Sequence, residues 1–202
     1  MTEEKQKVSY SWNKEVYHER EYFAPDGNRY KLDHVSNQTH TYTYKYRDNN
    51  GERKKGSIDI EVRYDPHCFT HERKEGELTP ALSLDEFDDG STKDRVFDHE
   101  RYLNSFQLVK SIQYLSRKNC KESRIKGKAL YFKQQDKQKP RYGLYVIIKV
   151  RNISGRLVMF VETAHNRNNE PYKLSLSDKE ETYDIILGRL IYSEWPELLP
   201  KQ

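Results

Sequence analysis

The sequence predicts an α+β fold: an antiparallel sheet with a central β-meander, N-terminal β-hairpins and one or two packed helices. Residues 128–165 hold three apolar runs of β-branched and aromatic residues, separated by turn-forming segments at 136–140 and 152–155. Two earlier pairs of runs flank turns with Asp, Asn and Gly. Residues 98–117 repeat apolar side chains every three or four positions, which is typical of a helix with one buried face.

The three runs of residues 128–165 are joined by short connections, and short connections permit only antiparallel pairing. The middle run is apolar on both faces, with Val146 and Ile148 on one face and Tyr145 and Ile147 on the other. Strands of this kind are usually covered on both faces. We therefore expect the middle run to lie at the centre of the sheet, with a helix or second layer on each side.

Two hairpins are expected before the meander. The first pairs residues 16–23 with 29–35 around Asp26 and Gly27, a favourable hairpin turn. The second pairs residues 39–47, where threonine and tyrosine alternate, with residues 57–64.

The main helix is predicted over residues 98–117, with Asp98 as its N-cap. Its apolar stripe is Tyr102, Phe106, Val109, Ile112 and Leu115. A second helix is predicted over residues 179–192, although Gly188 is unfavourable inside it.

Composition indicates a folded, tyrosine-rich protein of the cytoplasm. No run approaches the roughly 18 apolar residues of a membrane span, and the charged start is not a signal peptide. Two cysteines are too few for a disulfide framework. We expect residues 1–14 to be a flexible N-terminus and residues 15–202 to be a single α+β domain with an acidic surface loop at 72–94.

Charge is distributed unevenly along the chain. Residues 72–100 contain ten acidic and four basic side chains, whereas residues 101–151 contain fourteen basic and two acidic ones. A basic segment of this size favours a phosphate-rich partner such as RNA. The candidate nucleic-acid-binding residues are Lys126, Lys128, Lys149 and Arg151. The alternative is a solubilising surface, or one paired with the acidic segment.

His67, Cys68 and His71 form the densest group of chemically active side chains. With Cys120 they are a conceivable zinc site, but their spacing matches no common zinc pattern. The pattern favours the alternative, in which Cys68 is a small, half-buried apolar side chain at the end of a strand. No metal and no cofactor is therefore predicted.

RNA cleavage without metal requires a base, an acid and a cation near the phosphate. The candidate catalytic residues are His67, Arg101, Tyr102, Ser105, Thr163 and His165. Taken singly, each of these positions is also consistent with a structural role. The hypothesis requires the six side chains to converge on one basic concavity.

Three stretches resemble a poorly characterised bacterial family whose members are labelled stationary phase growth adaptation protein or heat-shock protein C. They are residues 67–70 (HCFT), residues 95–105 (RVFDHERYLNS) and residues 161–165 (VETAH). The family more often has Ser-Ala-Tyr at the last motif, where this chain has Thr163 and His165. The resemblance covers roughly residues 15–190 and implies a role in stress or growth control without implying a reaction.

Two functions therefore stay open. The first is a toxin-like, metal-independent ribonuclease or growth-control protein that acts on RNA. The second is a non-catalytic module that binds nucleic acid or protein through a basic face. A protein inhibitor or other protein partner fits either function, no membrane partner is expected, and the oligomeric state is not indicated.

Overall fold

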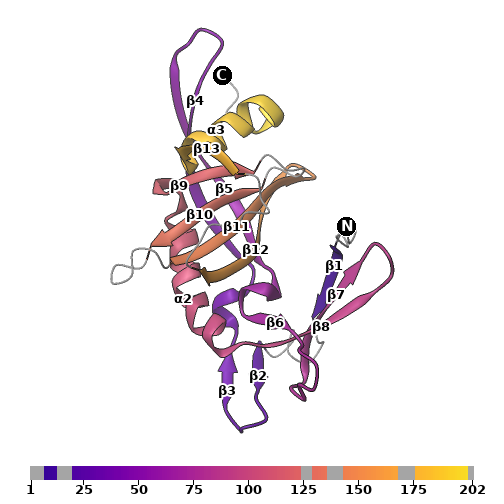
Figure 1. The fold of residues 1–202 in the computed structure, drawn as a ribbon. Helices are drawn as coiled ribbons and strands as arrows, with labels where there is room; N and C mark the ends of the chain where they lie inside the picture. The colour runs from indigo at the N-terminus through magenta and orange to yellow at the C-terminus, as the bar shows by residue number, and fades with distance from the viewer. Residues whose placement is uncertain (1–6, 13–19, 124–128, 136–142, 168–175, 200–202) are drawn as a thin grey trace.

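The computed structural model describes residues 7–12, 20–123, 129–135, 143–167 and 176–199. In these residues the strands form a curled seven-stranded sheet, a four-stranded sheet and a separate two-stranded hairpin (Figure 1). Two α-helices accompany them, α2 (His99–Gln113) and α3 (Tyr183–Glu194). The predicted α+β class is confirmed.

The large sheet contains the predicted meander at its centre. Its strand order is β13-β9-β10-β11-β12-β5-β4. The bounds are β4 (Gln38–Arg47), β5 (Arg53–Tyr64), β9 (Asn119–Ser123), β10 (Leu130–Gln135), β11 (Gly143–Ile153), β12 (Arg156–Arg167) and β13 (Leu176–Thr182). Strands β10, β11 and β12 pair antiparallel in succession, so β11 is the central strand as predicted.

The turn between β11 and β12 follows from its sequence. Ile153 pairs with Arg156, and both residues between them have positive φ, 52° at Ser154 and 82° at Gly155. Two positive φ values define a type I′ turn, whose twist matches that of the flanking strands. The other predicted turn of the meander, at residues 136–140, lies outside the described residues.

Both predicted N-terminal hairpins are present. Strands β2 (Glu21–Phe23) and β3 (Arg29–Lys31) form a short one, and the short helix η1 (Asp33–Val35) follows it. Strands β4 and β5 form a long one whose far end projects from the sheet. Strand β5 also pairs parallel with β12, from Ile60 opposite Leu157 to Tyr64 opposite Val161.

Helix α2 begins as predicted, because the Asp98 side chain accepts a hydrogen bond from the Arg101 backbone N–H at 3.0 Å. It lies along one face of the curled sheet (Figure 1). Its buried face differs from the expected stripe, since Phe106 is 43% exposed. The buried residues of the helix are Ser105, Leu108, Val109, Ser111 and Ile112.

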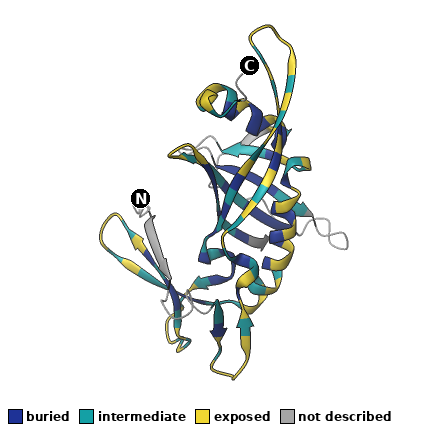
Figure 2. Ribbon diagram, turned by 180° about the vertical axis from the view of Figure 1, so that it is seen from behind, coloured by how far each residue is buried: buried dark blue, intermediate teal, exposed yellow. Residues whose placement is uncertain are grey.

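The two faces of the large sheet differ in polarity. Alternate residues of the central strands, such as Val146, Ile148 and Met159, join the helices in one apolar core. Figure 2 shows this buried interior and the exposed hairpin ends around it. In the described part of the chain, the opposite face carries polar contacts, including Lys149–Glu162 at 2.7 Å. Tyr145 and Val158 of that face are nevertheless buried. Among the described residues the two helices join the core on one face, and the second expected layer stays a prediction.

Residues 72–94 are not a long loop, which corrects the sequence-based expectation. They contribute to a four-stranded sheet with the order β1-β7-β8-β6. Its strands are β1 (Lys7–Trp12), β6 (Thr70–Glu72), β7 (Ala81–Phe87) and β8 (Thr92–Phe97). Strand β7 buries Leu82, Ser83 and the acidic Asp85, so the charge count concealed a strand. The expected flexible N-terminus includes β1, which pairs with β7.

Helix α3 confirms the second predicted helix and explains its glycine. A Cβ atom added at Gly188 would lie 2.0 Å from the backbone oxygen of Lys45 in β4. The helix therefore rests directly on the backbone of β4. Near this contact, Lys45 Nζ lies 2.6 Å from the buried Asp184 carboxylate, and the Tyr46 and Tyr192 rings stack.

The remaining short helices are η2 (Pro66–Cys68), η3 (Leu115–Arg117) and η5 (Pro196–Leu198). Among the described residues, none of the helices combines the length and apolarity needed to cross a bilayer.

The Gly188→Ala variant is expected to unfold more easily by about 2–3 kcal/mol, because the new methyl group must displace the β4 backbone. Urea denaturation measures the loss. Ser193→Ala, at an exposed position of the same helix, is the control and should stay within about 0.5 kcal/mol. Equal stability of the two variants would contradict the close packing of α3 on β4.

The Asp184 ion pair makes a pH-dependent contribution. Burial alone raises the pKa of Asp184, but hydrogen bonds from Lys45 and Thr182 outweigh it and leave the pKa below its usual value. A depressed carboxyl pKa stabilises the fold above the unfolded-state pKa of about 4 and loses this effect as the pH falls through the folded-state pKa. The stability gap between the wild type and Asp184→Asn should therefore shrink in acid, as urea midpoints across a pH series can test. A gap independent of pH would contradict this account.

Candidate binding site

His67 lies between two carboxylates. It belongs to η2, where its Nδ1 is 2.5 Å from Asp65 Oδ1, and its Nε2 is 3.0 Å from Asp85 Oδ2 in β7. Both ring nitrogens of His67 are thus engaged by carboxylates of the protein itself. In this arrangement His67 connects η2 to the small sheet.

Arg95 of β8 extends the same network. Its guanidinium donates to Thr70 Oγ1 and to the Thr70 carbonyl oxygen, each at 2.9 Å, and contacts Asp85 at 3.4 Å. Burial lowers the pKa of Arg95, and the Asp85 carboxylate opposes that shift. Arg101 Nη1 donates to the backbone oxygens of Thr70 at 2.6 Å and His67 at 3.1 Å. The contact between Arg101 and His67 therefore joins the guanidinium of Arg101 to the backbone oxygen of His67.

His71 is placed in a similar way. Its Nε2 lies 3.2 Å from Glu77 Oε2, and its Nδ1 lies 3.4 Å from Asp98 Oδ2. Because Asp98 caps α2, this contact ties β6 to the start of the helix.

Tyr102 and Ser105 belong to a different group of side chains. The Tyr102 ring packs against Tyr30 and Phe97, with centroids 5.2 and 5.4 Å apart. Ser105 is buried, and its Oγ lies 2.6 Å from His34 Nε2. These contacts attach the β2–β3 hairpin and η1 to α2.

Thr163 and His165 lie on β12, opposite Ile147 and Tyr145 of β11. The side chain of His165 is outside the described residues. Of the six candidate catalytic residues, the structure describes direct contact for the pair His67 and Arg101, and Ser105 donates to the Tyr102 carbonyl oxygen at 2.6 Å.

The cysteines do not support a shared metal site. Cys68 donates to the Val161 carbonyl oxygen beside β12, whereas Cys120 lies on β9, three strands away in the sheet. At about 4.8 Å per strand this separation exceeds any coordination sphere. Within the described residues, no group of three or more His, Cys, Asp or Glu side chains is arranged to hold a metal ion.

The candidate nucleic-acid-binding residues fall in two regions. Lys126 and Lys128 lie outside the described residues. Lys149 and Arg151 lie on β11, where Lys149 pairs with Glu162 and Arg151 lies 5.5 Å above the centre of the Phe160 ring. The two described cations are thus already engaged on the polar face of the sheet.

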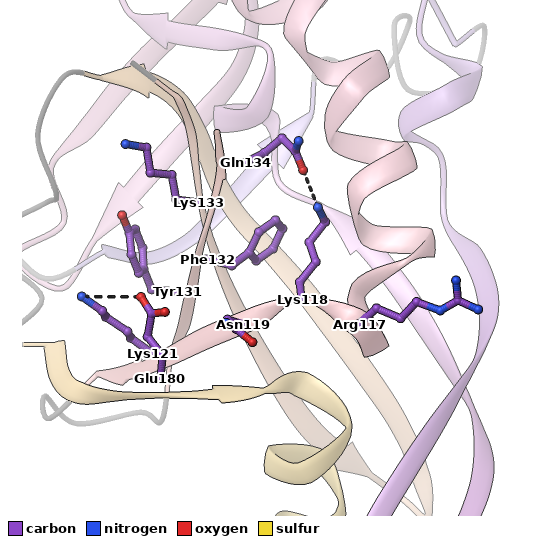
Figure 3. Close-up of a pocket in the computed structure, with 9 residues that line it drawn as sticks. All are labelled: Arg117, Lys118, Asn119, Lys121, Tyr131, Phe132, Lys133, Gln134 and Glu180. Carbon is purple, nitrogen blue, oxygen red and sulfur yellow. Dashed lines mark hydrogen bonds and ion pairs between the residues drawn. The ribbon is translucent and has the colours of Figure 1, made fainter. Parts of the chain in front are cut away.

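A basic pocket of about 480 Å³ lies elsewhere, at the end of β10 (Figure 3). Its volume is in the range of ligand sites. It is lined by Arg117, Lys118, Asn119, Lys121, Tyr131, Phe132, Lys133, Gln134 and Glu180. Four of these side chains are basic and one is acidic.

The pocket lies at a strand edge. Residues 131–134 all line it, although consecutive strand side chains point to opposite faces. Figure 3 shows Tyr131 and Lys133 on one side of β10, and Phe132 and Gln134 on the other. A cavity lined by side chains from both faces of β10 must extend around the edge of that strand.

The register explains why this edge is accessible. Strand β9 pairs with β10 only opposite Leu130 and Tyr131. The start of β9, at Asn119 and Cys120, stays paired with β13 on its other edge. Strands β9 and β10 diverge there (Figure 1), and residues of both strands line the pocket.

Lys118 is the most distinctive cation of the pocket. It is half-buried, and its Nζ donates to the neutral Gln134 amide oxygen. Burial lowers the pKa of Lys118. Burial also raises the pKa of the neighbouring Cys120 thiol to about 12, so the thiol is neutral and provides no counter-charge near pH 7.

The pocket was missed in the sequence, although the basic segment contains eight of its nine lining residues, including all four cations. The available signal was the density of lysine and arginine between residues 101 and 151. It does not reveal which cations share a cavity, since that depends on where β9 leaves β10.

The fold and pocket define an α+β protein with a curled mixed sheet and a basic pocket at the edge of an inner strand. The chain matches the model of the YjaZ family over residues 16–191 and belongs to that poorly characterised bacterial family. Searches of curated proteins and of solved structures found no match.

Arg95→Leu is expected to destabilise the protein by about 3 kcal/mol, because it leaves buried Asp85 and Thr70 with fewer partners. Chemical denaturation measures this loss. Adding Asp85→Leu should recover part of the loss by removing the buried charge. Lys93→Leu, which removes an exposed ion pair of the same strand, should cost less than about 1 kcal/mol. An Arg95 variant as stable as the Lys93 variant would contradict a stabilising role for this network.

Proposed function

We propose that this protein is a non-catalytic binding module whose basic pocket receives an anionic partner. The observation that carries the proposal is the half-buried Lys118, which faces a neutral amide inside a cavity lined by three further cations. A partly desolvated ammonium gains most from an anion, because charged hydrogen bonds are stronger than neutral ones.

The geometry favours binding over RNA cleavage. His67 and Arg101 contact carboxylates and backbone oxygens, and Tyr102 and Ser105 contribute to the attachment of a hairpin. Among the described side chains, His67, Arg101, Tyr102, Ser105 and Thr163 do not line the basic pocket. A ribonuclease site built on these residues would therefore need a separate cavity and a rearranged His67.

We place this binding in bacterial stress or growth control, in the cytoplasm. That role is implied by the labels of the proteins that the motifs at residues 67–70, 95–105 and 161–165 resemble, and it rests on the resemblance alone.

The Arg117→Glu, Lys121→Glu double variant is expected to elute from immobilised heparin at clearly lower salt than the wild type, because two pocket cations become anions. The matched control is Arg53→Glu, Lys55→Glu, which makes the same charge change at exposed positions of β5. The control should elute close to the wild type. Circular dichroism spectra establish that both variants fold.

Equal elution of the two double variants would contradict the proposal, since retention would then depend on net charge alone. Incubation of the wild type with bacterial RNA in EDTA tests catalysis in parallel. RNA cleavage lost in His67→Ala, Arg101→Ala would overturn the non-catalytic assignment.

A further inference from the structure

We propose that the exposed side of α2 is a self-association surface, on which a second copy of this chain packs antiparallel to form a twofold-symmetric dimer. The inference goes beyond the proposed function and does not depend on it. Six exposed residues of α2 and the segment that follows it form this surface, the α2 seam: Glu100, Leu103, Gln107, Lys110, Tyr114 and Arg117.

The first support is that large apolar side chains are exposed together on this helix. Leu103 is 55% exposed, Phe106 43% and Tyr114, the C-cap, 64%. The other exposed large apolar side chains of the described residues are scattered singly over β2, the β6–β7 connection, β11 and α3. Single exposed apolar residues are ordinary, whereas a group of them on one face marks an interaction site. Figure 2 shows that exposed positions recur along α2.

The second support is the spacing of the α2 seam. Its residues recur at intervals of three, four, three, four and three positions, the alternation of contact positions in a coiled coil. Residues at this spacing form one continuous ridge, because an α-helix has about 3.6 residues per turn. A second helix can pack along such a ridge at a shallow angle, as in antiparallel helix pairs. Arg117 extends the ridge from η3, the short helix that directly follows α2.

The third support is that the α2 seam is complementary to itself. In a twofold-symmetric pair, residues equally far from the axis lie opposite each other. With the axis between positions 108 and 109, the opposing pairs are Glu100 with Arg117, Leu103 with Tyr114, and Gln107 with Lys110. Opposite charges therefore meet at both ends, apolar side chains meet between them, and no two like charges are directly opposite. An antiparallel pair also brings together opposite ends of the two helix dipoles.

A second copy fits this charge distribution better than a partner of a single charge sign. An acidic segment or an anionic membrane would be attracted by Lys110 and Arg117, but it would be repelled by Glu100 at the other end. A basic segment would meet the reverse. A partner with opposite charges at its two ends matches the whole surface, and an antiparallel copy of the α2 seam has this distribution.

Phe106 provides an ordered apolar flank beside the α2 seam. Its ring stacks on His34, with centroids 3.9 Å apart, and is still partly exposed. A ring that is already held by stacking loses little conformational freedom when a partner covers it. Aromatic side chains are also enriched among the residues that dominate interface energies.

The α2 seam and the basic pocket share one residue. Arg117 belongs to both, whereas the three lysines of the pocket lie outside the α2 seam. The pocket therefore stays basic in the dimer.

The first test is the oligomeric state of the full chain. One helix from each copy forms a smaller interface than permanent dimers have, so we expect a reversible dimer whose population rises with protein concentration. Sedimentation velocity from micromolar to sub-millimolar protein measures this equilibrium. A chain that stays monomeric over the whole range would overturn the inference.

A charge exchange tests the pairing at the two ends. Arg117→Glu and Glu100→Arg each place like charges opposite each other, and each is expected to weaken dimerisation at least about tenfold. The double variant Glu100→Arg, Arg117→Glu restores opposite charges and should return to within about threefold of the wild type. The control is Arg53→Glu, the same charge change at an exposed position of β5, which should dimerise as the wild type does.

Circular dichroism establishes that these variants fold. Single variants that dimerise as tightly as the wild type would rule out the α2 seam as the contact. A double variant as weak as the single ones would rule out the antiparallel pairing.

Leu103→Gln tests the apolar contact. Because this side chain is largely exposed in the monomer, the urea midpoint of dilute protein should not change, whereas dimerisation should weaken about tenfold. Ile185→Gln, at an exposed apolar position of α3, is the matched control and should leave dimerisation unchanged. Equal dimerisation of the two variants would contradict the proposed interface.

Discussion

The parallel pairing of β5 with β12 is the constraint on which the rest of the structure depends. It joins the N-terminal hairpin to the C-terminal meander, segments about a hundred residues apart, through contacts from Ile60–Leu157 to Tyr64–Val161. Parallel neighbours require a long crossover. Here the crossover holds β6, β7 and β8 of the small sheet, α2, β9 and the first two meander strands. The pairing therefore fixes where each of these elements packs.

The segment that follows β5 connects this strand pairing to the small sheet. Asp65 donates its backbone N–H to the Val161 carbonyl oxygen at 3.0 Å, so η2 is held against β12. Asp65, His67, Asp85 and Arg95 then link η2 to β7 and β8 through charged contacts. Because these groups are largely withdrawn from water, each one depends on the others for its hydrogen bonds. Residue types typical of catalysis are used here to connect two sheets.

The opposite end of α2 shows the other consequence of the crossover. The chain leaves the helix through η3, enters β9 and pairs with β13 before it reaches β10. The pairing of β9 with β10 ends at Tyr131, and the pocket that contains Arg117 and Lys118 lies where the two strands separate. The end of this pairing and the path of the chain out of α2 thus bring the cations together. This combination distinguishes the pocket from the scattered cations on β11.

Local patterns in the sequence determined the elements of this protein. Alternation and turn residues specified the meander, the hairpins and the turn at Ser154 and Gly155, and an N-cap with helical spacing specified α2. These signals act over a few residues, so they can be recognised in the sequence without knowledge of the fold. The acidic stretch at 72–94 was wrongly predicted as a surface loop, because its high density of charge obscured the short strands. Only the tertiary structure decided that Gly188 meets the β4 backbone, that His67 lies between Asp65 and Asp85, and that Lys118 shares a pocket with Lys133. Each of these contacts joins segments distant in the chain, and their positions follow from strand order, which no local pattern records.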